Sequence, residues 1–296
     1  MRVRCLSVHA GYACGHAGAC CTAGWTIPVE EPLVQPLRAA GIRIGADRIA
    51  PVRDDACVFF EAGAGRLCTI HRVAGPALLP SVCRHFPRVI VNDPRGTSVT
   101  LSHFCPTAAA LLFDAVPLAI VTAPASIALD GTLEGLDATG VLPPLLAAGV
   151  LTDWDGYSAW EASAVAVFDD GNVAPEQAVG LLTGATDEAC TWRPGPEPMT
   201  AAVRRAFEHA RSRRRGGDGA GRDWRGFERA VNAFLAAHAF ASWAAYEPRG
   251  LRAIPAAVAR ALQMLTEEVS ASGILTRDAL IAAMRATDLR LRHRSS

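Results

Sequence analysis

Apolar residues recur at helical spacing through the last third of the chain. Residues 224–246 carry one such stripe of large apolar side chains, and residues 258–269 carry a second. An amphipathic helix buries one apolar face, so we predict two core-facing helices here. Thr200 and Thr276 each precede a further apolar stripe and are suited to cap a helix N-terminus. The C-terminal third is therefore predicted to be helical.

Helical periodicity is weaker in the middle of the chain. Helices are predicted at 157–168 and 175–182, the second of them ending at Gly184. Residues 108–129 are largely apolar, but an acid and two prolines interrupt them, which favours a buried helix and an extended segment over a membrane span. His238 falls on an apolar helical face, and we interpret it as a buried histidine with hydrogen-bond partners and not as a ligand.

The first 115 residues have a different character. Residues 1–27 are rich in glycine and poor in large apolar side chains, so burial alone offsets too little of the entropy lost on ordering. A structural zinc supplies about 10 kcal/mol or more to such segments. We therefore predict a mainly α protein in which an irregular, cysteine-rich metal- or cluster-binding N-terminal part packs on a helical C-terminal part. The predicted units are a cysteine-cluster domain at 1–115, a helical connector at 116–199 and a helical domain at 200–296.

Cysteines supply the candidate chemistry. Cys68 and His71 have the C-x-x-H spacing of a metal half-site, although His71 is equally well explained as capping a backbone carbonyl. Cys105 precedes a proline and is predicted to N-cap a helix, whose dipole favours a thiolate. For the adjacent Cys20 and Cys21 two alternatives stay open: they serve two centres, or one ligates while the other supports it or acts as a redox thiol. The candidate ligands of a metal or iron–sulfur centre are Cys5, Cys14, Cys20, Cys21, Cys57, Cys68, Cys83 and Cys105.

Charge and redox conditions narrow the choice of function. The chain carries 29 basic and 29 acidic residues, so no net field favours nucleic acid or an anionic membrane as a partner. No export signal is visible at the N-terminus, which predicts a cytoplasmic protein. Cytoplasmic thiols are kept reduced, so the cysteines favour metal or redox chemistry over a disulfide framework, which stays as the minor alternative. Cys190 stands apart from the others and is predicted not to ligate.

The order of the cysteines and their neighbours resembles the flagellin lysine-N-methylase family, within the broader group of zinc- or iron-chelating cysteine-cluster proteins. The resemblance covers about the first 115 residues, with a fainter likeness at 228–246. The chain departs from the family in its shorter length and in the five residues between Cys14 and Cys20. The matching positions are Cys5, Cys14, Cys20-Cys21, Gly24-Trp25, Ile27, Glu30, Cys57, Phe59-Phe60, Cys68, Ile70, Leu79, Cys83-Arg84, Phe86-Pro87-Arg88, Leu101-Ser102 and Cys105-Pro106.

The resemblance implies a protein-lysine N-methyltransferase that uses S-adenosylmethionine, carries a cysteine-bound iron–sulfur cluster (4Fe-4S) or zinc, and acts on a flagellin-like lysine. Chemistry adds one requirement, because a free lysine amine has a pKa of about 10.4 and must lose its proton before it attacks the sulfonium methyl. Glu30 is the acid on a matching position, and Tyr12 lies inside the cluster segment. Both are candidate catalytic residues.

The same cysteines are compatible with a second hypothesis. A non-catalytic zinc- or iron-binding module would use the centre for metal handling, or to stabilise a surface on which a partner docks. A redox sensor built on Cys20 and Cys21 is a third, minor idea. The sequence offers no methyl-donor motif that separates these hypotheses.

Overall fold

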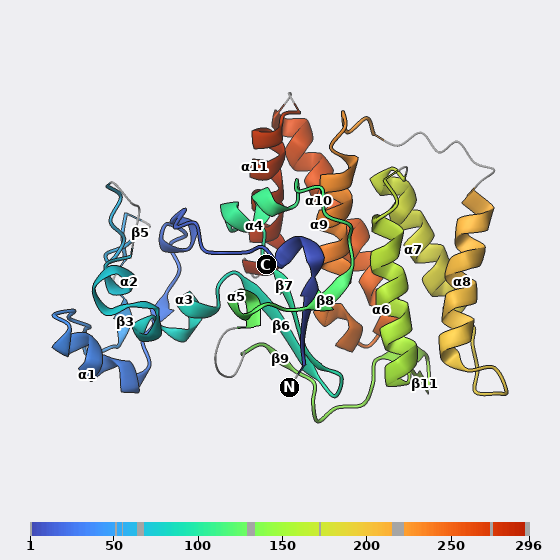
Figure 1. The fold of residues 1–296 in the computed structure, drawn as a ribbon, viewed down its shortest axis with the longest axis horizontal. Helices are drawn as coiled ribbons and strands as arrows, with labels where there is room; N and C mark the ends of the chain where they lie inside the picture. Colours follow the sequence, from blue (N-terminus) through green and yellow to red (C-terminus); the bar gives the residue numbers. More distant parts are fainter. Residues whose placement is uncertain are drawn as a thin grey trace.

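Helices dominate the protein, and a small mixed sheet lies beside them (Figure 1). The computed structural model describes residues 2–50, 52–54, 56–63, 68–128, 134–171, 173–214, 222–272 and 275–293. About 52% of the protein is helical, which confirms the predicted mainly α class. Within the described residues, no helix has the length and apolarity that crossing a bilayer requires.

A five-stranded sheet, which the sequence reading did not predict, occupies the middle of the molecule (Figure 1). Two runs of β-branched residues flank the turn Asp93–Gly96 and form its central hairpin, and they are the signal by which the sheet was detectable. The first strand pairs in parallel with the second strand of this hairpin, with Cys5 opposite Val99. In sheet order the strands are β8 (Ile120–Thr122), β1 (Val3–Leu6), β7 (Gly96–Leu101), β6 (Arg88–Asp93) and β9 (Leu136–Asp137).

Gly96 is required where the hairpin turns. Its φ of +118° lies in a region that side chains rarely adopt, and an added Cβ would come within 2.4 Å of the Arg2 backbone oxygen. The close approach of β1 to this turn therefore depends on glycine.

Six longer helices form the main core. Their buried apolar faces include Trp160, Phe207 and Phe234. Leu6 and Val91 of the sheet belong to the same apolar cluster, so this core spans both sides of residue 115, and the predicted division into three units stays a prediction. The helices are α6 (Trp154–Phe168), α7 (Pro175–Ala189), α8 (Met199–Arg214), α9 (Glu228–Ala239), α10 (Ala253–Ser272) and α11 (Arg277–Asp288).

Helix boundaries test the predicted caps. Thr276 caps α11 as predicted, because its side chain accepts a hydrogen bond from the Ala279 backbone N–H at 3.2 Å. The cap predicted at Thr200 is wrong, since α8 already begins at Met199 and Thr200 lies inside its first turn. The stop predicted at Gly184 is wrong: α7 continues to Ala189, because an interior glycine costs a helix only about 1 kcal/mol and tertiary packing overrides it.

The cysteine-rich segments lie at the opposite end of the sheet from α7 and α8 (Figure 1). They have a small apolar core of their own, centred on Val29, Leu37, Ile42 and Ile70. The elements around it are short: η2 (Ala19–Cys21), β2 (Ile27–Pro28), α1 (Glu31–Ala39), β3 (Ile49–Ala50), β4 (Val52–Arg53), β5 (Ala56–Cys57), α2 (Thr69–Ala74) and α3 (Ser81–His85).

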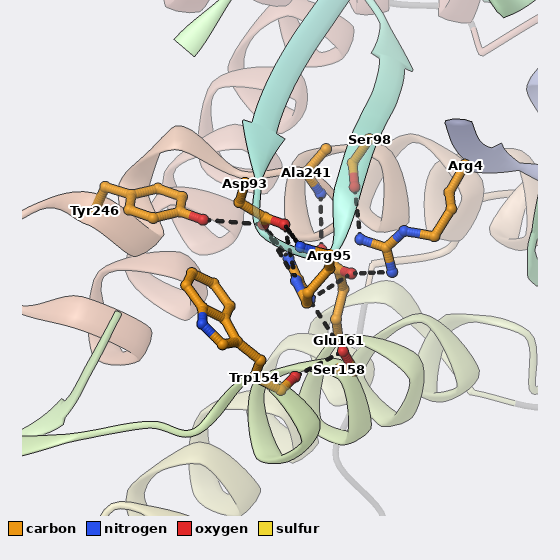
Figure 2. A network of polar contacts seen from close by, with 9 residues as sticks. All are labelled: Arg4, Asp93, Arg95, Ser98, Trp154, Ser158, Glu161, Ala241 and Tyr246. Atoms are coloured by element: carbon orange, nitrogen blue, oxygen red, sulfur yellow. Dashed lines mark hydrogen bonds and ion pairs between the residues drawn. The ribbon is translucent and has the colours of Figure 1, made fainter. Parts of the chain in front are cut away.

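A buried network of charges joins the sheet to the helices (Figure 2). Glu161 of α6 lies 3.3 Å from a guanidinium nitrogen of Arg4 and 3.3 Å from one of Arg95. Arg95 in turn pairs with Asp93 at 2.7 Å, and the Tyr246 hydroxyl donates to Asp93 at 3.0 Å. Two carboxylates thus face two guanidiniums, and the network is neutral as a whole. Desolvated charges of this kind are tolerated only when they remain paired.

Replacing Glu161 with Gln should destabilise the protein by about 3 kcal/mol, because two buried guanidiniums then lose their shared carboxylate. Urea denaturation measures this loss. The matched control is Glu31→Gln, which breaks an exposed pair with Arg48 and should change the free energy of unfolding by less than about 0.5 kcal/mol. Equal effects of the two variants would contradict a role for the buried network.

Candidate metal centre

Seven of the eight predicted ligands line one cavity of about 480 Å³, which we call the thiol cavity. None of the nine cysteines is in a disulfide, so the thiols are free. Cys5 is the exception among the candidates and does not line the cavity. The seven lining residues are Cys14, Cys20, Cys21, Cys57, Cys68, Cys83 and Cys105.

Local structure positions the five central thiols. Cys20 and Cys21 lie in the short 3₁₀ turn η2, Cys57 ends β5, Cys68 N-caps α2 and Cys83 is inside α3. These elements come from separate stretches of the first hundred residues, so the fold alone brings the thiols together. Electrostatic interactions link Cys20 with the thiols of Cys21, Cys57, Cys68 and Cys83.

The turn η2 directs two neighbouring side chains to the same place. The Sγ atoms of Cys20 and Cys21 are 3.8 Å apart, much too far for a disulfide. Four sulfur ligands at about 2.3 Å around a tetrahedral zinc are separated from one another by about 3.8 Å. The pair therefore has the spacing of two ligands of one ion, an arrangement that neither of the two alternatives drawn from the sequence includes.

The thiols resist ionising together. A hydrogen bond from Cys21 lowers the pKa of Cys20 to about 7. Burial raises the pKa of Cys83 to about 12, and the neighbouring thiols Cys20, Cys68 and Cys57 raise it further. Burial likewise raises the pKa values of Cys57 and Cys68. One thiolate thus suppresses the others, and only a cation among them would let several be thiolates at once.

A second pair of thiols lies toward the sheet. Cys105 N-caps α4 (Pro106–Leu111) as predicted, and its Sγ lies 3.9 Å from the Tyr12 hydroxyl. Cys14 is exposed, with its Sγ 3.9 Å from His16 Nδ1. Burial and the neighbouring Cys105 raise the pKa of Tyr12 well above its usual value, so the phenol stays protonated. Tyr12 is therefore a hydrogen-bond donor at this cavity and not a ready base.

Glu30 has a structural role in this fold. Its Oε1 accepts a hydrogen bond from the Ser81 backbone N–H at 2.9 Å, which ties the start of α3 to the start of α1. Burial opposes ionisation of Glu30, but the hydrogen bonds from Ser81 outweigh it and lower its pKa. Glu30 lines neither this cavity nor the adjoining one described below. The sequence did not reveal that this carboxylate lies outside the lining of the cavity that the thiols share.

Cys5 lies in the middle of β1, where its side chain is fully buried among apolar residues that include Val99 and Leu101. Burial raises the pKa of the Cys5 thiol to about 11. Cys190, predicted not to ligate, is buried in the main helical core. His71 does line the thiol cavity, with its ring 5.0 Å from that of His16. Burial and the nearby His16 lower the pKa of His71. Its imidazole is therefore neutral at neutral pH and can either donate a hydrogen bond or bind a metal.

The donor set fits a thiophilic metal or an iron–sulfur cluster, because it consists of free thiols gathered around one cavity. The positions do not form a finished site. Across the described part of the chain, no three or more His, Cys, Asp or Glu side chains are grouped so that they could hold a metal ion. Ligation by more than the Cys20–Cys21 pair thus requires the surrounding segments to close on the ion.

A second cavity of about 800 Å³ adjoins the first, and we call it the arginine cavity. Arg88, Glu134 and His293 line both cavities. The far wall is η4 (Trp243–Tyr246), the first turns of α10, and η6 (Leu289–His293). Of the three shared wall residues, only Arg88 lies at a position that matches the family resemblance. The three converge from distant segments, so no local pattern in the sequence predicts that they meet.

A buried carboxylate fixes the wall formed by η6. Asp288 lies 2.9 Å from His238 Nε2, 3.3 Å from His103 Nδ1 and 3.4 Å from Arg292 Nε. Burial opposes ionisation of Asp288, but Arg292 and the two histidines outweigh it and hold its pKa well below the usual range. His238 is therefore a buried, partnered histidine, as predicted. The series of polar contacts extends from His103 to His9, because the Nε2 atoms of these two histidines are 3.2 Å apart.

Comparison of this chain with family models, with curated proteins and with solved structures finds no match. The flagellin methylase resemblance therefore rests on the order of the cysteines and their neighbours in the sequence alone.

Acidification should destabilise the protein before its carboxylates titrate. Burial, followed by Arg292, lowers the pKa of His238 to about 4, against about 6.5 in the unfolded chain. The unfolded state therefore takes up a proton first, and as the pH falls from 6.5 toward 4 this group should remove up to about 1.4 kcal/mol of stability per pH unit. Urea denaturation at pH 7.5, 6.0 and 5.0 measures the slope.

The slope should be shallower in a His238→Gln variant and unchanged in His209→Gln, which alters an exposed histidine on α8. Parallel slopes for the wild type and His238→Gln would show that His238 is not held neutral by the fold.

Proposed function

We propose that the chain is an S-adenosylmethionine-dependent protein-lysine N-methyltransferase whose N-terminal thiols hold an iron–sulfur or metal centre. The observation that carries the metal-binding part is the convergence of seven free thiols from residues 14–105 on one cavity. The methyltransferase part is supported by the family resemblance of those cysteines and by the larger cavity that opens next to them.

Cys20, Cys21, Cys57, Cys68 and Cys83 are the residues that would hold the centre, because electrostatic interactions already connect their thiols. When bound, it would supply positive charge that stabilises several thiolates at once and cross-links segments with little apolar core. Cys14 and Cys105 lie toward the sheet side of the same cavity and are candidates to complete or flank it.

The shared wall of the two cavities supplies groups for lysine chemistry. Glu134 is an exposed carboxylate there and would attract the lysine ammonium. Burial lowers the pKa of His293, so its imidazole is neutral at pH 7 and can accept the ammonium proton. Its Nε2 lies 2.8 Å from the Ser102 hydroxyl, which fixes the ring. Glu134 and His293 thus take the place of Glu30 and Tyr12 as our candidates for these roles.

The transfer itself balances without another reactant. The freed amine lone pair forms the new nitrogen–carbon bond to the sulfonium methyl, while the carbon–sulfur bond breaks and its electron pair stays on sulfur. The products are methyl-lysine and S-adenosylhomocysteine, and the proton leaves through His293 to solvent. The chain's own contribution is to hold the amine deprotonated and aligned with the methyl group.

A non-catalytic metal module is the second candidate function. It is favoured by the small apolar core of the cysteine-rich part, whose buried members among the described residues are Val29, Leu37, Ile42 and Ile70. Such a core gains much of its stability from a bound metal even if no reaction takes place there.

Anaerobically purified protein should contain iron, with a visible absorption band, or zinc. Cys20→Ser and Cys21→Ser should each lose at least half of the bound metal, because the two sulfurs are spaced as ligands of one ion. Cys190→Ser is the matched control and should keep the metal, since Cys190 does not line the cavity and is buried in the helical core.

Metal analysis by mass spectrometry together with the visible spectrum reads out this experiment. Full metal content in both variants would overturn the assignment of the Cys20–Cys21 pair. A metal-free wild type prepared without oxygen would overturn the centre itself.

Methyl transfer can be measured without background from the enzyme. The chain contains no lysine, so any methyl-lysine formed from labelled S-adenosylmethionine belongs to the added protein substrate. We expect labelling of a flagellin-like substrate by the metal-loaded protein, and a loss of at least about tenfold in kcat for His293→Phe, which keeps the ring but removes the proton acceptor.

Arg204→Ala, on the exposed surface of α8, is the control and should keep full activity. Absence of methyl-lysine with every lysine-containing protein offered, while the centre is intact, would favour the non-catalytic module.

A further inference from the structure

The arginine cavity is large enough for a ligand the size of a nucleoside. Its volume of about 800 Å³ falls in the range of small-molecule sites. Alanines of α10, Ala253, Ala256 and Ala257, line one side, so no long side chain fills the space there. Nothing in the proposed lysine chemistry uses this side of the cavity.

Two of the cavity's guanidiniums have no partner among the residues that the structure describes. Arg88 donates to the backbone oxygen of Ile127, and Arg292 pairs with Asp288. In contrast, the side chains of Arg249 and Arg260 are exposed, and their guanidiniums make no hydrogen bond or ion pair with any described residue. Guanidiniums without partners on a cavity wall are suited to bind a carboxylate or a phosphate.

The cavity also carries carboxylates, which distinguishes between anionic ligands. Glu134 and Glu247 line it together with the arginines. A polyphosphate would meet repulsion from both carboxylates. A zwitterion, with one carboxylate for the arginines and a cationic group for the glutamates, matches the mixed lining better.

An aromatic ring with a fixed orientation lies on the wall of the arginine cavity. Trp243 is 51% exposed, yet its indole N–H donates to the Ile90 backbone oxygen at 3.0 Å, which fixes the ring. Its short helix η4 is anchored at both ends by the buried charge network: Ala241 N–H donates to Glu161, and Tyr246 donates to Asp93 (Figure 2). An exposed but immobilised tryptophan provides a stacking surface for a flat ring at low entropic cost.

We infer that the arginine cavity is the methyl-donor site: S-adenosylmethionine binds there with its adenine against Trp243, its carboxylate at Arg249 and Arg260, and its cationic groups toward Glu134 and Glu247. The inference rests on the proposed methyltransferase function. It places the donor against the wall formed by Arg88, Glu134 and His293, which is also a wall of the thiol cavity. A lysine that enters along this wall would thus meet the methyl group and the proton acceptor together.

Calorimetric titration of the metal-loaded protein with S-adenosylmethionine tests the site. Arg249→Ala and Arg260→Ala should each raise Kd at least about tenfold, because each removes a charge-assisted contact. Trp243→Ala should weaken binding similarly, and Trp243→Phe should recover most of it because the stacking ring is kept. Arg204→Ala, an exposed arginine of α8 outside the cavity, should bind as the wild type does.

The outcomes separate the site from the function. If the wild type binds S-adenosylmethionine and all three alanine variants bind equally well, the location is wrong while the methyltransferase proposal stands. If the wild type binds neither S-adenosylmethionine nor S-adenosylhomocysteine, the methyltransferase proposal fails. If ATP binds more tightly than S-adenosylmethionine and depends on the same arginines, the cavity is a phosphate site and the inference is overturned. The arginine variants alter exposed side chains that have no partner in the described part of the chain, so they are expected to fold even if Trp243→Ala does not.

Discussion

Two buried carboxylates, those of Glu161 and Asp288, hold together the segments that form the walls of the arginine cavity. Each faces cationic or imidazole groups that come from far away in the sequence: Arg4 and Arg95 for Glu161, and His238, His103 and Arg292 for Asp288. A desolvated carboxylate is costly unless it is paired, so each one selects a single arrangement of the segments around it. Glu161 thereby fixes the segment that carries Trp243, and Asp288, through its pair with Arg292, fixes the one that carries His293.

The cysteine-rich part follows the opposite principle. Its five central thiols line one cavity, where burial and the neighbouring thiols raise the pKa values of Cys57, Cys68 and Cys83 while that of Cys20 is lowered to about 7. Its apolar core is small. A bound metal cation would let several of these thiols ionise and ligate it, and it would add the stability that burial does not supply. The rest of the protein has an extensive helical core and does not depend on such an addition.

The contact between these two parts is where chemistry is best placed. Arg88 begins strand β6, Glu134 precedes β9, and His293 ends η6, yet all three line both cavities. A centre in the thiol cavity and a ligand in the arginine cavity would therefore share a wall, and the ligand would also meet His238 and Arg292 of the Asp288 network, which line the arginine cavity. Glu161 and its partners Arg4 and Arg95 line neither cavity, so this network can be altered separately from the proposed activity.

Local patterns in the sequence determined much of what is seen here. Helical periodicity predicted the C-terminal helices. The threonine before α11 and the proline after Cys105 predicted the N-caps of α11 and α4. The clustering of cysteines predicted the residues that line the thiol cavity, with the exception of Cys5. Such signals depend on residues a few positions apart. The sheet was missed although β-branched residues marked its hairpin, because β1 reaches its parallel partner β7 across some ninety residues. Only the tertiary structure decided that Glu30 caps a helix and that Cys5 is buried in a strand. It alone brought Glu134, His293 and Trp243 together, because long-range packing and the pairing of buried charges set those contacts, and neither leaves a local pattern in the chain.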